Sequence, residues 1–330
     1  MVVFDLTSLG CNSLLIWVRY NHSLFDLISH YVLRPWQESN LRTRLRKPML
    51  YPLSYRGLVT KGRLRPLFTG RISQRHFLIL FFIRLVKSNG IISIGGKNMV
   101  SEMVNFEAGD STARGYLASP EGTGPGVMVI QEWWGLAPQI KSVCDRLAEN
   151  GFVALAPDLY HGELAQHSEM DKAGELMSTL PPDRAVRDMS GAIDYLLKHS
   201  NVEGESVGVV GFCMGGMLSL LIAASEGERI AAVAPFYGAP LGDSEPDWTN
   251  LKARVEGHFA SVDDFFPPDS VTELENKLME MGKDVTFSIY PQTGHAFANE
   301  ENPLGTYNSE IADVAWGKVL DMFNEELGGS

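Results

Sequence analysis

The sequence feature that most constrains the fold is a strand–turn–helix unit built around one cysteine. The apolar run Val207–Val210 leads into GFCMG (residues 211–215), and a helical stretch follows directly. A glycine two positions to either side of Cys213 allows a turn so sharp that a side chain there would collide with the backbone. Such a turn presents its central residue as a nucleophile, and the dipole of the following helix would favour a thiolate. The alternative for Cys213 is a buried structural cysteine.

From Met99 onward, short runs rich in Val, Ile and Ala alternate with helical stretches, which predicts a mostly parallel central sheet with helices on both faces. No internal repeat or long linker divides this part, so we expect one α/β domain over 99–330. The expected strands are Met103–Phe106, Gly115–Ala118, Gly126–Ile130, Val153–Ala156, Val207–Gly211, Ala231–Phe236, Val255–Phe259 and Thr286–Tyr290. The expected helices are Pro138–Asn150, Asp183–His199, Met214–Ser225, Ser270–Met281 and Ile311–Leu327.

Residues 1–98 differ in composition from the rest of the chain. They hold 15 Lys and Arg against three carboxylates, a net charge of +12, whereas residues 99–330 hold 13 against 37, a net charge of −24. Helical periodicity is absent from 1–98, and the run 38–57 resembles peptides conceptually translated across transfer-RNA genes. We expect translation to start at Met99 or Met103 and 1–98 to be a non-native extension with little or no stable fold. A functional basic extension and a targeting segment are the alternatives.

Charge and cysteine content also limit which cellular location and which binding partners we expect. Three cysteines cannot form a disulfide framework, and the N-terminus lacks the pattern of a signal peptide, so we expect a reducing, cytoplasmic setting. The longest apolar run, Phe77–Ile83, is far shorter than the ~20 residues of a membrane span. The acidic body would repel phosphate backbones and anionic membranes. We therefore expect a small-molecule substrate, no nucleic-acid or membrane partner, and a monomer or small homo-oligomer.

A histidine and an aspartate follow later strands, in the order that a nucleophile of this kind requires. His295 comes just after the expected strand Thr286–Tyr290, and Asp263 just after Val255–Phe259. Active sites of parallel sheets gather at such carboxyl ends. His295 would accept the thiol proton while Asp263 orients its ring. Asp264 is the alternative acid; among the remaining candidates, His258 fits a core position, His161 a loop and Cys144 helix packing.

The loop QEWWG (131–135) follows the expected strand Gly126–Ile130. In enzymes with such a nucleophile turn, this loop supplies one backbone N–H of the oxyanion hole, and the residue after the nucleophile supplies the other. We expect these donors to be the N–H groups of Trp133 and Met214. Each donor is worth on the order of 3 kcal/mol in the transition state. Glu132 belongs to this loop and directly precedes two tryptophans, a position where we expect a functional carboxylate rather than a solvated one.

Taken together, these motifs resemble the dienelactone hydrolase (carboxymethylenebutenolidase) family of the α/β-hydrolase fold. The resemblance spans 100–328 and includes QEWWG, PDLY (157–160), GFCMGG (211–216), the segment from His258 to Asp263, and YPQTGHAF (290–297). It implies a Cys213–His295–Asp263 triad without metal or organic cofactor, and a glutamate, here Glu132, that helps to generate the thiolate. The substrate-pocket residues that we expect are Trp134, Tyr160, Phe297 and Asn299.

The sequence departs from this family at its two substrate-binding arginines. Asn299 stands where the family has the arginine four residues after the catalytic histidine, and residues 159–183 contain no arginine for the second. Loss of such a bidentate clamp removes specific carboxylate recognition, unless Lys172 or Arg184 replaces it. The sequence thus predicts a hydrolase of small esters or lactones acting through an acyl-enzyme. The alternative is a non-catalytic ligand-binding protein on the same fold.

Overall fold

The computed structural model describes residues 16–19, 28–31 and 99–328. The chain divides into two units, Met1–Gly96 and Lys97–Ser330. In the first unit, strand β1 (Ile16–Arg19) pairs antiparallel with β2 (Ile28–Tyr31). The expectation that 1–98 lacks a stable fold otherwise falls outside the described residues.

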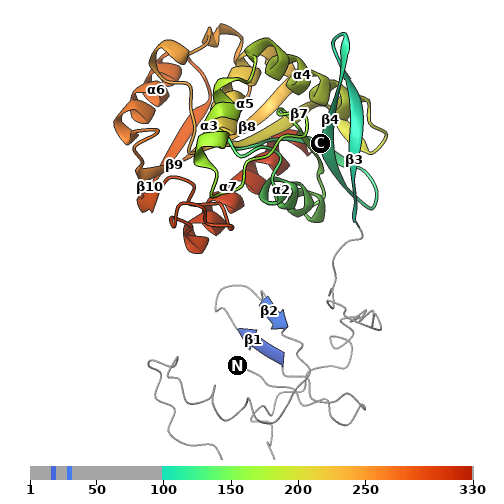
Figure 1. Cartoon of the computed structure of the whole chain (residues 1–330), viewed down its shortest axis with the longest axis horizontal. Helices are drawn as coiled ribbons and strands as arrows, with labels where there is room; N and C mark the ends of the chain where they lie inside the picture. The colour runs from blue at the N-terminus through green and yellow to red at the C-terminus, as the bar shows by residue number, and fades with distance from the viewer. Residues whose placement is uncertain (1–15, 20–27, 32–98, 329–330) are drawn as a thin grey trace, which may run out of the picture. The chain divides into compact units, whose positions relative to one another are not determined.

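The second unit is built on an eight-stranded sheet in the order β10-β9-β8-β7-β5-β6-β4-β3 (Figure 1). Its strands are β3 (Met99–Ala108), β4 (Ser111–Pro120), β5 (Gly124–Ile130), β6 (Val153–Pro157), β7 (Val202–Phe212), β8 (Ile230–Phe236), β9 (Arg254–Val262) and β10 (Val285–Gly294). The six strands from β10 to β6 run parallel, and β4 and β3 are antiparallel to their neighbours. The predicted mostly parallel sheet is confirmed.

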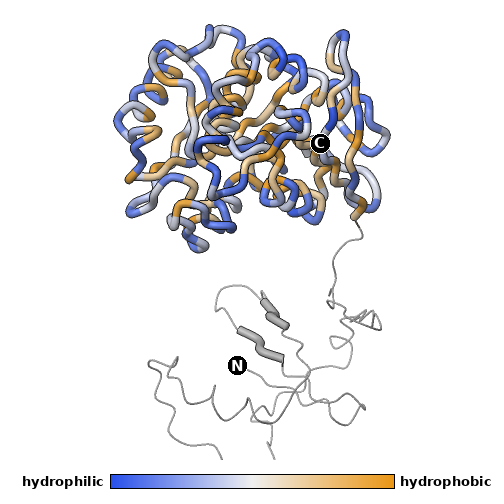
Figure 2. The backbone as a smooth tube through the Cα atoms, viewed as in Figure 1, coloured by the Kyte–Doolittle hydropathy of each residue, from blue (hydrophilic) through white to orange (hydrophobic). Residues whose placement is uncertain are grey.

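Helices cover both faces of this sheet, as expected. They are α2 (Pro138–Glu149), α3 (Met170–Ser178), α4 (Pro182–Lys198), α5 (Met214–Glu226), α6 (Pro268–Glu280) and α7 (Ser309–Leu327), with short 3-10 turns at Gly227–Arg229, Gly242–Ser244 and Trp248–Asn250. Apolar side chains of α4, α5 and α6 share one core cluster, and those of α2 and α7 share the other. Figure 2 shows apolar residues concentrated along the strands and the helix faces turned toward them. Hydrophobic burial on both faces therefore stabilises the sheet.

One helix, α3, was not among the expected elements. Its nine residues include a single buried side chain, Ala173, so no apolar stripe marks it in the sequence. The hairpin at the edge of the sheet is also longer than expected: β3 and β4 each extend over ten residues, where four were expected. The outer half of β3 is mostly exposed, which leaves little hydrophobic signal there.

The helices of this fold can also be compared with helices that span membranes. Across residues 16–19, 28–31 and 99–328, no helix has the length and apolarity that crossing a bilayer requires.

Candidate active site

Five adjacent parallel strands each deliver one polar residue at the carboxyl end. The residues that follow the strands in this way are Glu132 (after β5), Cys213 (after β7), Tyr237 (after β8), Asp263 (after β9) and His295 (after β10). These strands are neighbours in the sheet and point the same way, so their carboxyl ends lie along one edge. The sheet topology thereby gathers residues that are up to 163 positions apart in the sequence, from 132 to 295.

Cys213 occupies a strained turn between β7 and α5. Its φ angle is 54°, in the left-handed region that non-glycine residues rarely adopt, and its N–H donates to the Phe236 carbonyl at 3.0 Å. A Cβ on Gly211 would stand 2.0 Å from the Gly215 carbonyl oxygen, and one on Gly238 would stand 1.9 Å from the Cys213 carbonyl oxygen. Backbone therefore packs against backbone around the cysteine, as the sequence predicts for the turn, and the strain is held by the surrounding structure.

His295 is oriented by Asp263. The imidazole Nδ1 donates to Asp263 Oδ2 at 2.8 Å, and both side chains are buried. The other carboxylate oxygen, Oδ1, accepts the backbone N–H groups of Phe265 at 2.9 Å and Phe266 at 3.2 Å. With Nδ1 fixed as the donor, Nε2 is left to accept a proton, which is the tautomer that a general base needs.

Glu132 lies in a buried cage of neutral hydrogen-bond donors. Its side chain is 3% exposed; the Tyr237 hydroxyl donates to Oε1 at 3.2 Å, and Asn299 Nδ2 donates to Oε2 at 2.9 Å. Burial raises the pKa of the Glu132 carboxyl above its usual value, although the charge of His295 and the two hydrogen bonds oppose that rise. A carboxylate with a raised pKa is a stronger proton acceptor than an ordinary glutamate.

The surroundings of Cys213 disfavour its thiolate. Burial first, and then the negative charge of Glu132, raise the pKa of the Cys213 thiol above the usual value, while a hydrogen bond from the backbone of Met214 opposes the rise. Desolvation and the nearby carboxylate thus act against the thiolate that the helix dipole favours. Forming the nucleophile therefore requires a base within the site.

The predicted oxyanion donors follow the nucleophile and Glu132 in the sequence. Met214 begins α5, and its backbone N–H bonds the Cys213 sulfur. Trp133 directly follows Glu132 and its ring packs edge-on against Trp134, with 4.9 Å between centroids. The role of both N–H groups in binding an oxyanion stays a prediction.

The expected pocket residues have different surroundings. The Tyr160 hydroxyl donates to Met214 Sδ at 3.5 Å, and the charge of Cys213 contributes to the raised pKa of Tyr160, so this residue lies beside the nucleophile. Trp134 is 3% exposed and packs edge-on against His167. Phe297 is fully buried among core aromatic rings, Phe236, Tyr237 and Tyr290. Their contact with substrate stays a prediction, and so does that of Asn299, whose amide bonds Glu132.

The residues set aside as structural lie where expected. Cys144 and His258 are fully buried, and burial lowers the pKa of His258 to about 3 while it raises that of Cys144. His161 lies in a loop and donates from Nε2 to the buried carboxylate of Asp188 at 2.7 Å. None of these three belongs to the strand-end cluster.

Tyr237 is the site residue that the sequence reasoning missed. It follows the expected strand Ala231–Phe236 directly, so the rule that located Asp263 and His295 would have pointed to it as well. Its φ angle is 37°, and its N–H donates to the His258 carbonyl at 2.8 Å. The backbone thus turns sharply to bring its hydroxyl to Glu132.

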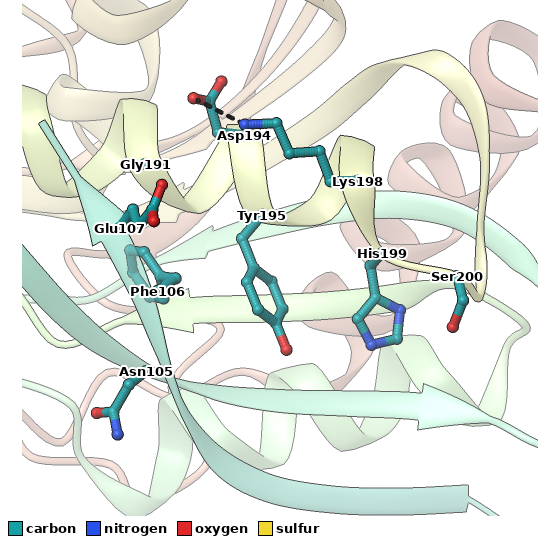
Figure 3. A pocket seen from close by; sticks show the side chains of 9 residues that line it. All are labelled: Asn105, Phe106, Glu107, Gly191, Asp194, Tyr195, Lys198, His199 and Ser200. Carbon is teal, nitrogen blue, oxygen red and sulfur yellow. Dashed lines mark ion pairs between the residues drawn. The ribbon is translucent and has the colours of Figure 1, made fainter.

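A separate hollow of about 430 Å³ lies between β3 and α4 (Figure 3). Figure 3 shows the side chains of Tyr195 and His199 along it, with the ion pair of Lys198 and Asp194 at its rim. No member of the strand-end cluster lines this hollow. Within the parts of the chain that the structure describes, no group of three or more His, Cys, Asp or Glu side chains is placed to hold a metal ion.

Solved structures of other proteins share this fold. A crystal structure from Klebsiella pneumoniae, described as a "Putative Dienelactone Hydrolase", superposes with a TM-score of 0.62 at 25% identity, covering 69% of this chain and 99% of its own. The Pyrococcus horikoshii acylaminoacyl peptidase, 14% identical with a TM-score of 0.54, covers 71% of this chain and 43% of its own and shares the fold alone.

Relatives by sequence cover the same part of the chain. The Aquifex pyrophilus "Protein usf" is 37% identical, and an Aquifex aeolicus protein named "Putative carboxymethylenebutenolidase" is 34% identical; each match covers 69% of this chain and 100% of the relative. The model of the dienelactone hydrolase family matches residues 113–327. The resemblance drawn from the motifs is confirmed: this chain belongs to the dienelactone hydrolase family and has the α/β-hydrolase fold.

Proposed function

We propose that this protein hydrolyses small esters or lactones through a covalent acyl-enzyme on Cys213. The observation that carries the proposal is the 2.8 Å hydrogen bond between His295 and Asp263, formed at strand ends next to the strained turn that presents Cys213. A nucleophile, a base and a group that orients the base are the parts that acyl transfer requires.

In the first half of the reaction, the Cys213 proton moves to Nε2 of His295 and the sulfur attacks the carbonyl carbon. The carbonyl oxygen becomes an oxyanion, and the N–H groups of Met214 and Trp133 donate to it. The intermediate collapses as the C–O bond breaks, and the proton on Nε2 passes to the departing alkoxide. In the second half, water gives a proton to His295 and attacks the thioester, which releases the acid and restores the thiol.

Glu132 assists the formation of the thiolate. Its charge opposes ionisation of Cys213 at rest, and its raised pKa makes it able to take up a proton. By holding the Cys213 proton before it passes to Nε2 of His295, Glu132 loses the charge that opposes ionisation, and the thiolate becomes easier to form. Asn299 and Tyr237 act as positioning residues because they hold the two carboxylate oxygens.

Neutral substrates fit this site better than carboxylates. Asn299 offers a neutral amide that already bonds Glu132. The two cations that were alternatives for a clamp both donate to backbone carbonyls, Lys172 to Leu164 at 2.7 Å and Arg184 to Leu159 at 3.3 Å. A charged hydrogen bond contributes roughly 1.5–3 kcal/mol, so a carboxylate gains little here. We expect an uncharged lactone to have a kcat/KM at least as high as that of the dienelactone carboxylate.

A non-catalytic ligand-binding protein is the alternative function, and mass spectrometry separates the two. Incubation with an activated ester should add one acyl group to Cys213, and the Cys213→Ala protein should gain none. An unmodified Cys213 together with no ester hydrolysis would support the binding protein instead.

We also propose that residues 99–330 suffice for this activity, in the cytoplasm, as a monomer or small homo-oligomer. The +12 charge of 1–98 and the absence of helical periodicity there support this, because no core-forming face can be recognised in that part of the sequence. A chain that starts at Met99 should keep the kcat/KM of the full chain. Loss of folding or activity in that shorter chain would assign a function to residues 1–98.

A further inference from the structure

The position of the leaving group follows from the chemistry of the triad. Nε2 of His295 returns its proton to the departing alkoxide, so the alcohol oxygen of an ester must lie within hydrogen-bond reach of that nitrogen. The remainder of the alcohol then extends past the side chains that surround the imidazole. These side chains define a leaving-group subsite, which is distinct from the oxyanion donors on the acyl side.

Three aromatic rings surround the imidazole of His295. The ring centroid of Phe265 lies 4.8 Å away, that of Tyr237 lies 5.2 Å away, and that of Phe266 lies 5.9 Å away. Tyr237 is fully buried and Phe266 is partly buried in the core. Phe265, in contrast, is 60% exposed. Of the three rings, it is the one that still has most of its surface available to a ligand.

Phe265 is also held in place despite its exposure. Its backbone N–H donates to Asp263 Oδ1 at 2.9 Å, and the other oxygen of the same carboxylate bonds His295. The backbone of Phe265 and the imidazole are therefore held by the same buried carboxylate. Val262, 69% exposed, adds a second apolar side chain just before Asp263. Exposed apolar side chains are common on protein surfaces. Phe265, however, lies beside the catalytic base, where the leaving group of a substrate would contact its ring.

The charges near this ring disfavour an anionic leaving group. The carboxylates of Glu132 and Asp263 are buried and act on Cys213. The charge of Glu301 acts on Glu132, and Asp264 directly precedes Phe265. A negatively charged alcohol would be repelled by them, whereas a flat neutral ring can stack against Phe265. Aromatic pairs contribute about 0.5–1.5 kcal/mol beyond their buried area.

We propose that Phe265 is a specificity-determining residue that selects esters whose alcohol carries a neutral aromatic ring. The proposal rests on the proposed function, because it requires His295 to protonate the leaving alcohol. It assigns to this chain a preference for arylmethyl and aryl esters over esters of short alkyl alcohols.

The test compares benzyl acetate with ethyl acetate on the full chain. The two esters share their acyl group and have leaving alcohols of similar acidity, so the ratio of their kcat/KM values reports recognition of the ring. In Phe265→Ala this benzyl-to-ethyl ratio should fall about fivefold. Phe265→Tyr keeps a ring and should restore the ratio. The control Val314→Ala removes an exposed apolar side chain of α7 and should leave the ratio unchanged.

Each outcome tests either the role of Phe265 or the proposed function. A Phe265→Ala ratio equal to that of the unaltered chain, with hydrolysis still dependent on Cys213, would overturn the role of Phe265 and leave the proposed function standing. A ratio that falls equally in Phe265→Ala and Phe265→Tyr would also overturn it, because the ring would then not be what is recognised. No hydrolysis of either ester by the unaltered chain, or equal hydrolysis by Cys213→Ala, would instead overturn the proposed function itself.

Discussion

The turn after β7 and the segment after β6 both begin at carboxyl ends of parallel strands, yet they are held in different ways. Around Cys213, backbone atoms approach so closely that a single added Cβ at Gly238 would overlap the Cys213 carbonyl oxygen, at 1.9 Å. Part of the segment 158–181 instead packs in a small apolar cluster. This cluster consists of Trp134, Ala165 and Ala173 with Trp133 and Leu176 against it, and it is separate from both large cores.

The two regions therefore serve different purposes: the turn positions the nucleophile, and the segment after β6 contributes to substrate recognition. The nucleophile must be placed to within a fraction of an ångström, and close backbone packing achieves that. The segment after β6 presents Tyr160 to the site, and its residues Ala165, Ala173 and Leu176 pack in this small cluster rather than in the large cores. Regions of this kind lie at the low-stability end of a fold, where binding loops are commonly found. The comparison leads to four predictions, from the largest expected effect to the smallest.

Removing the thiol should have the largest effect. Cys213→Ala should lower kcat by about 10³-fold or more, because His295 and Asp263 act only through the nucleophile. Cys144→Ala is the matched control: that cysteine is buried in α2 and is not a member of the strand-end cluster. Steady-state hydrolysis of an activated ester measures both. Equal losses from the two substitutions would mean that the thiols serve folding rather than catalysis.

Two glycine substitutions compare the two regions directly. Gly238→Ala should lower the free energy of unfolding by at least about 3 kcal/mol, since its Cβ would stand 1.9 Å from a backbone oxygen. Gly174→Ala in α3 meets nothing within 4 Å and should raise stability by about 0.5–1 kcal/mol through helix propensity. Urea unfolding of both proteins checks this. A similar change for the two would remove the structural contrast on which the comparison stands.

The features that the sequence predicted are those that depend on local pattern. The glycine spacing around Cys213 and the position of Asp263 and His295 after apolar runs both have local signals, because a strand end can be recognised within about ten residues. The hydrogen bond between Asn299 and Glu132 joins residues 167 positions apart. No spacing rule reveals such a contact, so Asn299 was assigned to the pocket alone. The same limit applies to the pKa of the Cys213 thiol, because the burial and the charge of Glu132 that raise it are tertiary properties.

Asn299 should influence the pH dependence through Glu132. Its hydrogen bond lowers the pKa of that carboxyl, so Asn299→Ala should raise the pKa further. If Glu132 must be ionised to take up a proton, the acidic limb of the kcat/KM profile moves to higher pH, and kcat falls by about tenfold. The control Asn324→Ala changes an exposed amide on α7 and should leave the limb in place. An unmoved limb in Asn299→Ala would mean that Glu132 takes no part in thiol activation.

The smallest effect concerns the stability cost of the Glu132 charge. The pKa of this carboxyl is raised in the folded protein by burial. Below the ordinary pKa of a glutamate, folded and unfolded chains are both protonated and no cost exists; as the pH rises through the higher folded pKa, the folded chain must hold a buried charge and loses stability. Glu132→Gln should therefore raise Tm by about 2–4 °C at pH 8, which corresponds to about 1 kcal/mol for a domain of this size. The gain should shrink toward zero at pH 4. Calorimetry at both pH values checks this, and an equal gain at both would show that the amide stabilises by packing, with the charge of Glu132 already balanced by its donors.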